Sequence, residues 1–543
     1  MTGVQTCALP ISETAIPRGY KKAPDQTFEI KDKKFTEIES IESTDVRYAA
    51  FKFRKDLETS NGRTAPEANA LFEIYPKKYG SYANTPGEFR DKVYTNGSGI
   101  TSSTKSLPAI QYDFDGVYVV NQIGGSNYHQ ALRDFQITLD RWNADGLMVV
   151  NLGVDKPQTR KLEIKKLDKE TGEVVKEAGI QFKIYDRITK EYVVRGGKDV
   201  FETNSDGIIQ FNDFPAGLYR LEEIKAPKEY NLAPAKNFEV AGVGGTEVTV
   251  TCEDPHIPPE VKTTALDSET DDHISDCAET VKIIDTVSYD HLYVGKKYTI
   301  KGKLIDKDTG NPLLVNGSEV TASTTFVTTS PKGTAKLEYV LNASALKGKT
   351  VVVFEDLYKE DKKVASHADI NDKNQSVHFP KVSTKALDER TQEHMSSAGN
   401  KTVLIDTVKY ENVLSGKEYT VSGVLMDKDT GKPLLDGSGK EIKGEITFTA
   451  AGSSGEVKVK YTVDTEKLKG RKSVVFEKLF YKGKQVAKHE DIKDDGQTVI
   501  FPEIKTRAID KETDDHVGSL GEKIEIIDTV SFKNANADRK SVV

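Results

Sequence analysis

The feature that most constrains the fold of this chain is a repeat that begins three times in its second half. The three stretches align without gaps, and each is followed at the same distance by IDTV: VKTTALDSETDDH (261–273), VSTKALDERTQEH (382–394) and IKTRAIDKETDDH (504–516). The first two copies continue through matching DKDTG and VVFE segments, and the third stops before its VVFE segment. A period of about 120 residues exceeds the roughly 20–50 residues of solenoid repeats. The sequence therefore predicts consecutive copies of a whole domain.

A second pattern lies upstream of the repeat, at residues 161–255. A looser copy of this second pattern begins at residue 51. Its segments read as a first strand, a hairpin and a closing strand: KLEIKKLD (161–168), TNSDGIIQFNDFPAGLYRLEEIKAPKEY (203–230) and VTVTCEDP (248–255). Apolar and polar residues alternate along these runs, which is typical of half-buried strands, and DKDTG-like turns separate them. We therefore predict an all-β fold of tandem immunoglobulin-like β-sandwich domains in a linear array.

The chain divides at Pro-containing linkers such as HIPPEV and FPKV. Both ends resemble translated sequencing adapters, so we expect an internal piece of a longer protein between them. The expected segments are adapter-derived residues 1–12, the end of a sandwich domain at 13–45, a degenerate upstream-type domain at 46–157, a full one at 158–257, two repeat domains at 258–381 and 382–503, a truncated third at 504–537, and adapter-derived residues 538–543.

Composition excludes several classes of function. The formal net charge of −8 is spread along the chain, so no basic face indicates nucleic-acid binding. No apolar run approaches the roughly 20 residues needed to cross a bilayer. Only three Cys occur, without paired spacing, so neither a disulfide framework nor a zinc site is predicted. DIKDDG resembles a calcium loop, but its counterpart DINDKN places Lys373 at a ligand position. We expect no metal and no cofactor.

Lys166 continues the inward face of the strand that holds Leu162 and Ile164. Burying an ammonium is costly, and burial therefore favours the neutral amine, which is a nucleophile. Glu223, in LEEIKAP, can lie beside it as a proton donor, and Asp254 offers a carbonyl just past the closing strand. The alternative is a Lys that reaches solvent from a strand end and an exposed Asp.

The residues KLD, YRLEEIKAP and EDP resemble the Cna B-type (SpaA-like) domains of Gram-positive pilins and adhesins. The resemblance covers about 100 residues. It implies that Lys166 and Asp254 join in a self-made isopeptide bond and that Glu223 assists.

The looser copy at 46–157 departs from this pattern. Gln122 stands where the Glu is expected, and the Lys position is ambiguous between Arg54 and Lys55. Asn151 is the candidate acceptor there, with Lys55 as its partner. A Gln cannot shuttle a proton, so the sequence leaves open whether this domain is crosslinked.

Each full copy of the repeat carries a Thr near its first strand and a Gln near its last. The pairs are Thr263 with Gln375 and Thr384 with Gln497. A hydroxyl can attack a carboxamide and release ammonia when a base removes its proton. The candidate helpers are His bases that titrate near neutrality, Asp residues that orient them, and Glu residues that burial would keep protonated to polarise the Gln carbonyl: His367, Asp372 and Glu355 in one copy, and His489, Asp494 and Glu477 in the other.

These residues resemble the VaFE-type repeat, or Thr–Gln ester-bond domain, of Gram-positive surface adhesins. The resemblance spans 260–503 and includes VVFE and the His, Asp and Gln spacing twice. It implies an intramolecular ester between the first-strand Thr and the last-strand Gln. Thr506 holds the same place in the truncated copy. Another recurring set stays open as alternative bases: His273, His394 and His516. The Asp residues of IDTV can satisfy backbone donors at a strand start.

Together these features predict a cell-surface stalk or adhesin fragment, extracellular and wall-attached in a Gram-positive bacterium, whose domains crosslink themselves against force and proteolysis. Crosslinking is single-turnover, so we do not expect an enzyme. A missing distal domain would contact a host or matrix ligand, and a missing C-terminus would anchor the chain. The alternative is a ligand-binding module, with the loop 77–97 of a SpaA-like domain as its contact. A hydrolase is disfavoured because no Gly-lined oxyanion elbow is present.

Overall fold

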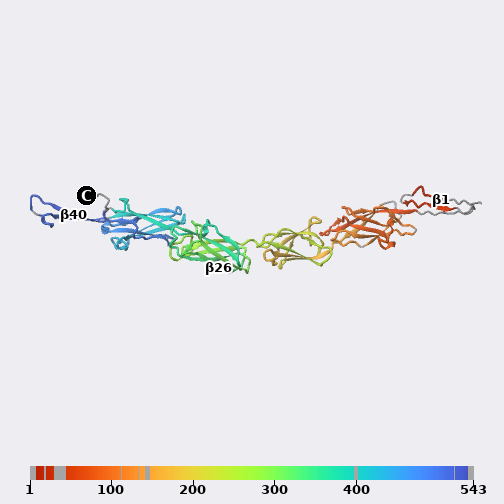
Figure 1. The fold of residues 1–543 in the computed structure, drawn as a ribbon, viewed down its shortest axis with the longest axis horizontal. Helices are drawn as coiled ribbons and strands as arrows, with labels where there is room; N and C mark the ends of the chain where they lie inside the picture. The colour runs from red at the N-terminus through yellow and green to blue at the C-terminus, as the bar shows by residue number, and fades with distance from the viewer. Residues whose placement is uncertain are drawn as a thin grey trace, which may run out of the picture. The chain divides into compact units, whose positions relative to one another are not determined.

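The computed structural model describes residues 8–16, 20–29, 45–111, 113–132, 134–140, 147–396, 401–518 and 520–535. Within them the chain forms β-strands and short 3₁₀ turns and no α-helix, which confirms the all-β prediction. No helix in these ranges is long and apolar enough to cross a membrane. The chain splits into two compact units, residues 1–257 and 258–543, drawn from red to yellow and from green to blue in Figure 1. Most of the segment predicted at 13–45, and all of 538–543, lie outside the described residues.

The first unit begins with short pairings and then a two-sheet domain. Strand β1 (Ala8–Ile11) pairs with β3 (Gln26–Glu29), and β2 (Tyr20–Lys21) pairs with β4. One sheet has the order β11-β10-β6-β7, and in the other β4 pairs with β12, β5, β8 and β9. The elements of this domain are β4 (Val46–Glu58), β5 (Thr64–Pro66), β6 (Leu71–Pro76), η1 (Lys77–Tyr79), η2 (Gly87–Phe89), β7 (Asp91–Tyr94), β8 (Ile100–Ser102), β9 (Leu107–Pro108), β10 (Val117–Gly124), β11 (Phe135–Thr138) and β12 (Leu147–Asp155).

The second domain of this unit packs the sheet β17-β13-β20 against the sheet β15-β14-β18-β19, with β16 pairing β14. Its first and last strands, β13 and β20, lie side by side and run parallel. Its strands are β13 (Thr159–Asp168), β14 (Gln181–Asp186), β15 (Glu191–Tyr192), β16 (Phe201–Glu202), β17 (Ile208–Pro215), β18 (Gly217–Lys225), β19 (Lys236–Val240) and β20 (Glu247–Asp254).

The two repeat domains of the second unit share one topology. The first has the sheets β21-β22-β27 and β26-β23-β28-β29, and the second has β31-β32-β35 and β34-β33-β36-β37; β30 and β38 pair with β28 and β36. Their elements are β21 (Glu260–Asp267), β22 (Val281–Asp290), β23 (Lys297–Asp306), β24 (Leu314–Val315), β25 (Ser318–Glu319), β26 (Thr321–Val327), β27 (Gly333–Leu341), β28 (Thr350–Lys359), β29 (Lys362–His367), η3 (Lys373–Gln375), β30 (Ser376–His378), β31 (Lys381–Asp388), β32 (Thr402–Glu411), β33 (Glu418–Asp427), β34 (Lys443–Thr449), β35 (Gly455–Val463), η4 (Thr465–Leu468), β36 (Lys472–Tyr481), β37 (Lys484–His489) and β38 (Thr498–Ile500).

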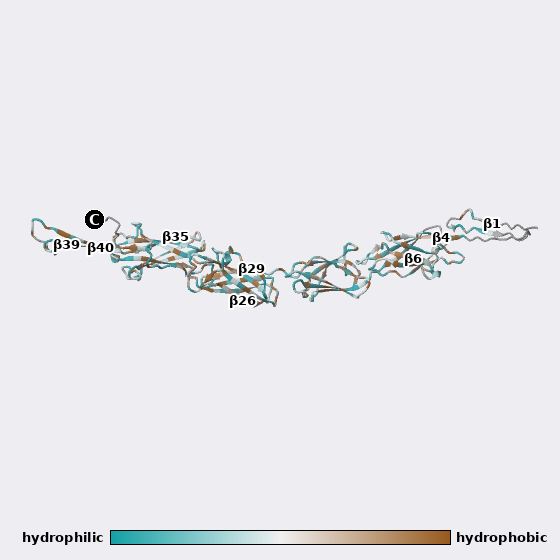
Figure 2. Cartoon of the chain, in the orientation of Figure 1, coloured by the Kyte–Doolittle hydropathy of each residue, from teal (hydrophilic) through white to brown (hydrophobic). Residues whose placement is uncertain are grey.

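The truncated third copy forms a hairpin of β39 (Glu503–Asp510) and β40 (Ile526–Lys533). Within the described residues no second sheet covers this hairpin, so Ile504, Ile526 and Phe532 are exposed. Brown segments of the β39 and β40 ribbons in Figure 2 mark hydrophobic residues on these strands. In the complete domains the equivalent strands bury such residues against the opposite sheet.

Side-chain alternation sets which residues enter each core. Along β21 the buried residues are Val261, Thr263, Ala265 and Asp267, and the residues between them are exposed or half-buried. Hydrophobic and hydrophilic residues are interspersed along the strands of the domains in Figure 2. Polar residues at inward positions are therefore buried between the two sheets. Thr263, a candidate reactive residue, holds such a position.

The acidic turns that recur along the chain have a local cause. The side chain of Asp267 accepts hydrogen bonds from the backbone N–H groups of Glu269 and Thr270, both at 2.9 Å. The same Asx turn closes the equivalent segment after Asp168, Asp306, Asp388, Asp427 and Asp510. Because the carboxylate satisfies two donors within three residues, each DKDTG-like segment ends one strand and starts a turn.

A missing side chain makes room inside each repeat domain. Gly423 of β33 lies opposite Glu477 of β36, and the hydroxyl of Tyr461 fills the space above it. A Cβ at Gly423 would overlap this hydroxyl. Gly302 stands in the same relation to Tyr339 in the first repeat domain. These glycines let a buried Tyr approach the sheet beside the acidic residue.

We expect Gly423→Ala to lower the free energy of unfolding of its domain by about 1–3 kcal/mol, the usual cost of overpacking a core. Gly452→Ala is the matched control, because a Cβ there meets only the carbonyl oxygen of Ser454 at an ordinary 3.7 Å. Hydrogen exchange of peptides within 402–500 measures the local opening free energy. Equal protection in the two variants would contradict the packing role given to Tyr461.

Candidate functional site

The first and last segments of the first repeat domain meet at Thr263 and Gln375. Thr263 lies on β21 and is 5% exposed, whereas Gln375 ends the turn η3 before β30 and is fully buried. Although 112 residues separate them, the Gln375 amide nitrogen donates a hydrogen bond to the Thr263 hydroxyl. It also donates to Glu355 Oε2 at 2.5 Å. The structure thus brings together the hydroxyl, the carboxamide and one acid that the sequence predicted.

The second repeat domain has the same arrangement. The Gln497 amide nitrogen donates to the Thr384 hydroxyl and to Glu477 Oε2, the latter at 2.6 Å. The Thr384 hydroxyl lies 3.4 Å from Glu477 Oε2. Two domains of different sequence therefore converge on one geometry, so the contact does not depend on the details of either core.

Sequence analysis missed a second acid in each site. Asp285 on β22 and Asp406 on β32 are fully buried. Burial, and then the neighbouring Asp285 charge, raises the pKa of Glu355 to about 10, and burial also raises the pKa of Asp285. The structure therefore places two carboxyl groups in one dry site, and burial favours the protonated form of each. A signal was present, because the IDTV Asp recurs at a fixed distance after each Thr and continues the inward face of its strand.

The predicted His–Asp pairs form beside these acids. His367 Nε2 lies 2.8 Å from Asp372 Oδ2, and His489 Nε2 lies 2.8 Å from Asp494 Oδ2. His367 stands opposite Glu355 in the β28–β29 register, and its charge lowers the pKa of Asp285. Among the described hydrogen bonds, none joins His367 to Thr263. The imidazole thus lies next to the acid pair rather than on the hydroxyl.

The alternative His residues lie in turns after the first strands. His394 Nδ1 is 3.1 Å from the backbone oxygen of Thr498, and the His273 carbonyl accepts a hydrogen bond from His378 N. No described hydrogen bond links His273 or His394 to the reactive Thr of its domain. In the truncated copy, Thr506 and His516 are exposed.

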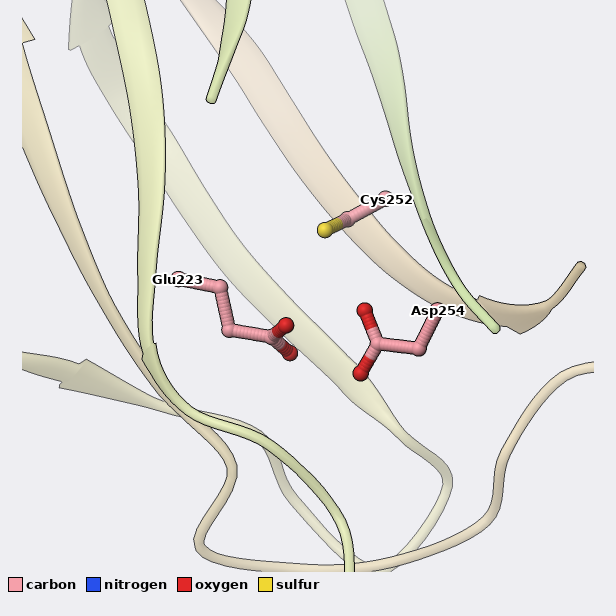
Figure 3. Close-up of side chains that lie close together, drawn as sticks. All are labelled: Glu223, Cys252 and Asp254. Atoms are coloured by element: carbon pink, nitrogen blue, oxygen red, sulfur yellow. The ribbon is translucent and has the colours of Figure 1, made fainter. Parts of the chain in front are cut away.

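In the second domain of the first unit, Lys166 is fully buried between two acids, as the inward face of β13 predicted. Its Nζ lies 3.0 Å from Glu223 Oε1 and in direct contact with Asp254 Oδ1, and none of the three side chains is exposed. Figure 3 shows Glu223 and Asp254 turned toward each other from β18 and β20, with Cys252 beside them. The structure therefore brings together all three residues predicted for this site.

Electrostatics at this site favours neutral groups. Burial and the neighbouring Glu223 raise the pKa of Asp254 to about 7. Burial also raises the pKa of Cys252 to about 12, so its thiol stays protonated. Glu223, Cys252 and Asp254 are close enough to hold a metal ion. However, the Lys166 ammonium lies 3.6 Å from Cys252 Sγ and already fills this space with positive charge. The donor set fits an amine and two acids better than a metal.

In the domain at 46–157 the structure selects Lys55, which is fully buried, over Arg54. It does not bring Asn151 to Lys55, because Asn151 is exposed and accepts a hydrogen bond from the N–H of Gly153. Asp155 takes that place, with Oδ1 2.6 Å from Lys55 Nζ. Gln122 lies in the site as predicted and donates to Asp155 Oδ2 at 2.9 Å.

Comparison with known protein families agrees with both patterns. The model of the T-Q ester bond containing domain matches residues 259–379, 380–501 and 502–541. The model of the SpaA prealbumin-like fold domain matches residues 160–254. None of the curated proteins compared with the chain matches it.

Solved structures match the chain at low identity and low TM-score. The Bacillus anthracis TIE protein is 17% identical with a TM-score of 0.29, over 64% of this chain and 52% of its own, so this chain spans about half of its length. The shaft pilin SpaA from Lactobacillus rhamnosus GG is 18% identical with a TM-score of 0.19, over 38% of this chain and 98% of its own. The minor pilin GBS52 of Streptococcus agalactiae is 18% identical with a TM-score of 0.19, over 39% and 97%.

The three ranges matched by the ester-bond model cover more than half of the chain. Both complete ranges contain the buried Thr–Gln contact and the acids described above. The chain belongs to the family of proteins that carry the T-Q ester bond containing domain.

Proposed function

We propose that the chain is part of an extracellular surface stalk whose domains tie their own first and last segments together. The bonds are esters between Thr263 and Gln375 and between the equivalent pair of the second repeat, and an isopeptide bond between Lys166 and Asp254. The observation that carries the proposal is the buried contact of the Gln375 amide with a hydroxyl and a protonated acid. The second repeat domain supports it independently.

Ester formation follows from this geometry. The Thr263 oxygen attacks Gln375 Cδ, a C–O bond forms, and the C–N bond breaks. Ammonia leaves with its two amide hydrogens and one proton that began on Thr263. Glu355 contacts the departing nitrogen, not the carbonyl oxygen that the sequence analysis expected, and with Asp285 it can take up the Thr263 proton and deliver it to that nitrogen.

Isopeptide formation uses the amine of Lys166. The neutral Nζ attacks Asp254 Cγ, a C–N bond forms, a C–O bond breaks, and water leaves. Glu223, 3.0 Å from Nζ, can carry the proton from the nitrogen to the departing hydroxyl. The raised pKa of Asp254 favours this step, because a protonated carboxyl loses water more readily than a carboxylate. Each reaction happens once per domain, so this chemistry is not enzymatic turnover.

Such bonds would change how each domain responds to tension. Force that enters at β21 would pass through the Thr263–Gln375 ester and leave at β30, bypassing the strands between them. Closing a loop of this length also stabilises the domain by about 4–5 kcal/mol in the loop-entropy model developed for disulfides. Domains are usually stable by only about 5–15 kcal/mol, so the gain is large. It also needs no oxidant, which suits a chain with so few Cys.

Location at the wall-attached surface of a Gram-positive bacterium, and contact with a host or matrix ligand, belong to the same proposal. Membership of the ester-bond domain family supports the extracellular surface location.

We expect the part of the full chain from residue 158 to 503 to weigh less than its translated mass by two ammonia molecules from the esters and one water from the Lys166 bond. Thr263→Ala should restore one ammonia, because no hydroxyl remains to attack. Thr264→Ala is the matched control, since this neighbour faces solvent on the same strand. Tandem mass spectrometry of proteolytic peptides identifies the joined residues. A linear Gln375 peptide from folded wild-type protein would refute the ester.

We expect a pH-dependent stability in a chain whose first ester is blocked by Gln375→Ala. With its pKa raised to about 10, Glu355 keeps a proton in the folded domain that the unfolded chain releases above about pH 4.5. The free energy of unfolding therefore falls as pH rises between these values, by up to about 1.4 kcal/mol per pH unit.

Adding Glu355→Gln to that background should flatten the dependence, because one titrating group is gone. Pulse proteolysis in urea, from about pH 5 to about pH 9, follows the unfolding of this domain. Identical slopes in the two backgrounds would show that Glu355 is ionised in the fold.

A further inference from the structure

The domain at 46–157, which no family model matches, contains a buried ammonium with two acids. Lys55 is 0% exposed, and its Nζ lies 2.6 Å from Asp155 Oδ1 and 3.6 Å from Glu67 Oε2. It also donates to the backbone oxygen of Asp56 at 3.0 Å. An ion triad of this kind is costly to bury, and one ammonium cannot neutralise two carboxylates. The geometry places the amine within reach of two acids to which its proton can pass.

Glu67 supplies the acid that the sequence lacks at position 122. It follows β5 and is 1% exposed, and burial raises its pKa. Its backbone N–H donates to the carbonyl of Lys55 at 3.0 Å, and its Oε1 accepts from Ser126 N at 2.8 Å. Its other oxygen, Oε2, faces Lys55. The carboxyl is thus fixed beside the amine from the segment after β5, whereas the acid of the neighbouring domain, Glu223, lies on β18.

Gln122 fixes the acceptor instead of carrying a proton. Its amide nitrogen donates to Asp155 Oδ2, and its oxygen accepts from Leu132 N at 3.2 Å. A Cβ at Gly125 would lie 2.5 Å from Glu67 Oε1 and 2.8 Å from Gln122 Nε2, so only glycine allows both side chains to approach there. Oδ1 of Asp155 is left to face Lys55.

Strand register places the pair as in the neighbouring domain. The parallel strands β4 and β12 pair Leu57 with Asp155, so Lys55 stands two residues before the partner of the acid. The parallel strands β13 and β20 pair Asp168 with Asp254, which puts Lys166 at the same offset. The two domains therefore present an amine and an acid across the same first and last strands.

We propose that the domain at 46–157 closes its own isopeptide bond between Lys55 and Asp155, with Glu67 as the proton carrier. Lys55 Nζ attacks Asp155 Cγ, a C–N bond forms, a C–O bond breaks, and water leaves. Glu67 takes the proton from the nitrogen and gives it to the departing hydroxyl, so the charges balance. The bond covalently joins β4 to β12 and is independent of the bonds proposed for the other domains.

The test is tandem mass spectrometry of proteolytic peptides from the full chain. We expect a branched peptide that joins Lys55 to Asp155, lighter than its two parts by one water. Glu67→Gln, close in shape to the protonated acid, should lose this branched peptide and keep the Lys166–Asp254 peptide. Arg54→Met is the matched control, because Arg54 is the exposed neighbour of Lys55 and its loss should leave the bond intact.

Linear peptides with a free Lys55 amine in folded wild-type protein would overturn the proposal, whatever the state of the other bonds. Complete crosslinking in Glu67→Gln would overturn the role of Glu67. If Glu67→Gln fails to fold, the wild-type peptide and Lys55→Arg still decide, because Lys55→Arg keeps a cation but removes the nucleophile and must abolish the branched peptide.

Discussion

The cost of burying ionisable groups between the ends of each domain is the constraint on which the rest of the structure depends. Lys166, Glu355 and Asp254 are buried, and burial raises the pKa of the two carboxyl groups, so their protonated forms are favoured. An amine without its proton is a nucleophile, and a protonated carboxyl is an acid. The same burial that makes these residues poor contributors to a simple hydrophobic core makes them reactive toward one another.

Topology decides which parts of a domain such a bond would hold. In the two upstream-type domains the reactive residues lie on adjacent parallel strands of one sheet, β4 with β12 and β13 with β20. A bond there resists shear between neighbouring strands. In the repeat domains Thr263 belongs to the sheet β21-β22-β27, whereas Gln375 precedes β30, which pairs with β28 in the opposite sheet. A bond there ties the two layers of the sandwich together. The two proposed bonds would therefore hold two different parts of their domains.

Much of this could be predicted from the sequence, because strand alternation is local. Alternation along one strand predicted that Lys166 points inward, and the repeated spacing predicted Thr263 and Glu355 as members of one site. Alternation fails where the backbone is irregular. The β4–β12 register shifts between Asn151 and Val154, and Gly153 has a positive φ of 87°. Because this irregularity interrupts the two-residue period of β12, Asp155 takes the place expected for Asn151. Glu67 follows a three-residue strand, which is too short for a periodic signal. Asp285 carried a repeated signal, but its contact with Glu355 forms only when the two sheets of the sandwich pack together.

The two kinds of site also differ in how they balance charge, and in the proposed chemistry this gives the His–Asp pair of the repeat domains its role. Lys166 brings a positive charge and its own proton to two acids, so one proton transfer leaves an amine, an acid and a single carboxylate. Thr263 and Gln375 are neutral, and the acids Glu355 and Asp285 have no ammonium beside them. His367 is held by Asp372 at 2.8 Å, and its charge lowers the pKa of Asp285, which favours the ionised form of Asp285 beside a protonated Glu355. In this arrangement Asp285 can accept the proton of Thr263 and Glu355 can donate one to the leaving nitrogen, and His367 acts through the charge it imposes on the acid pair rather than by touching the hydroxyl.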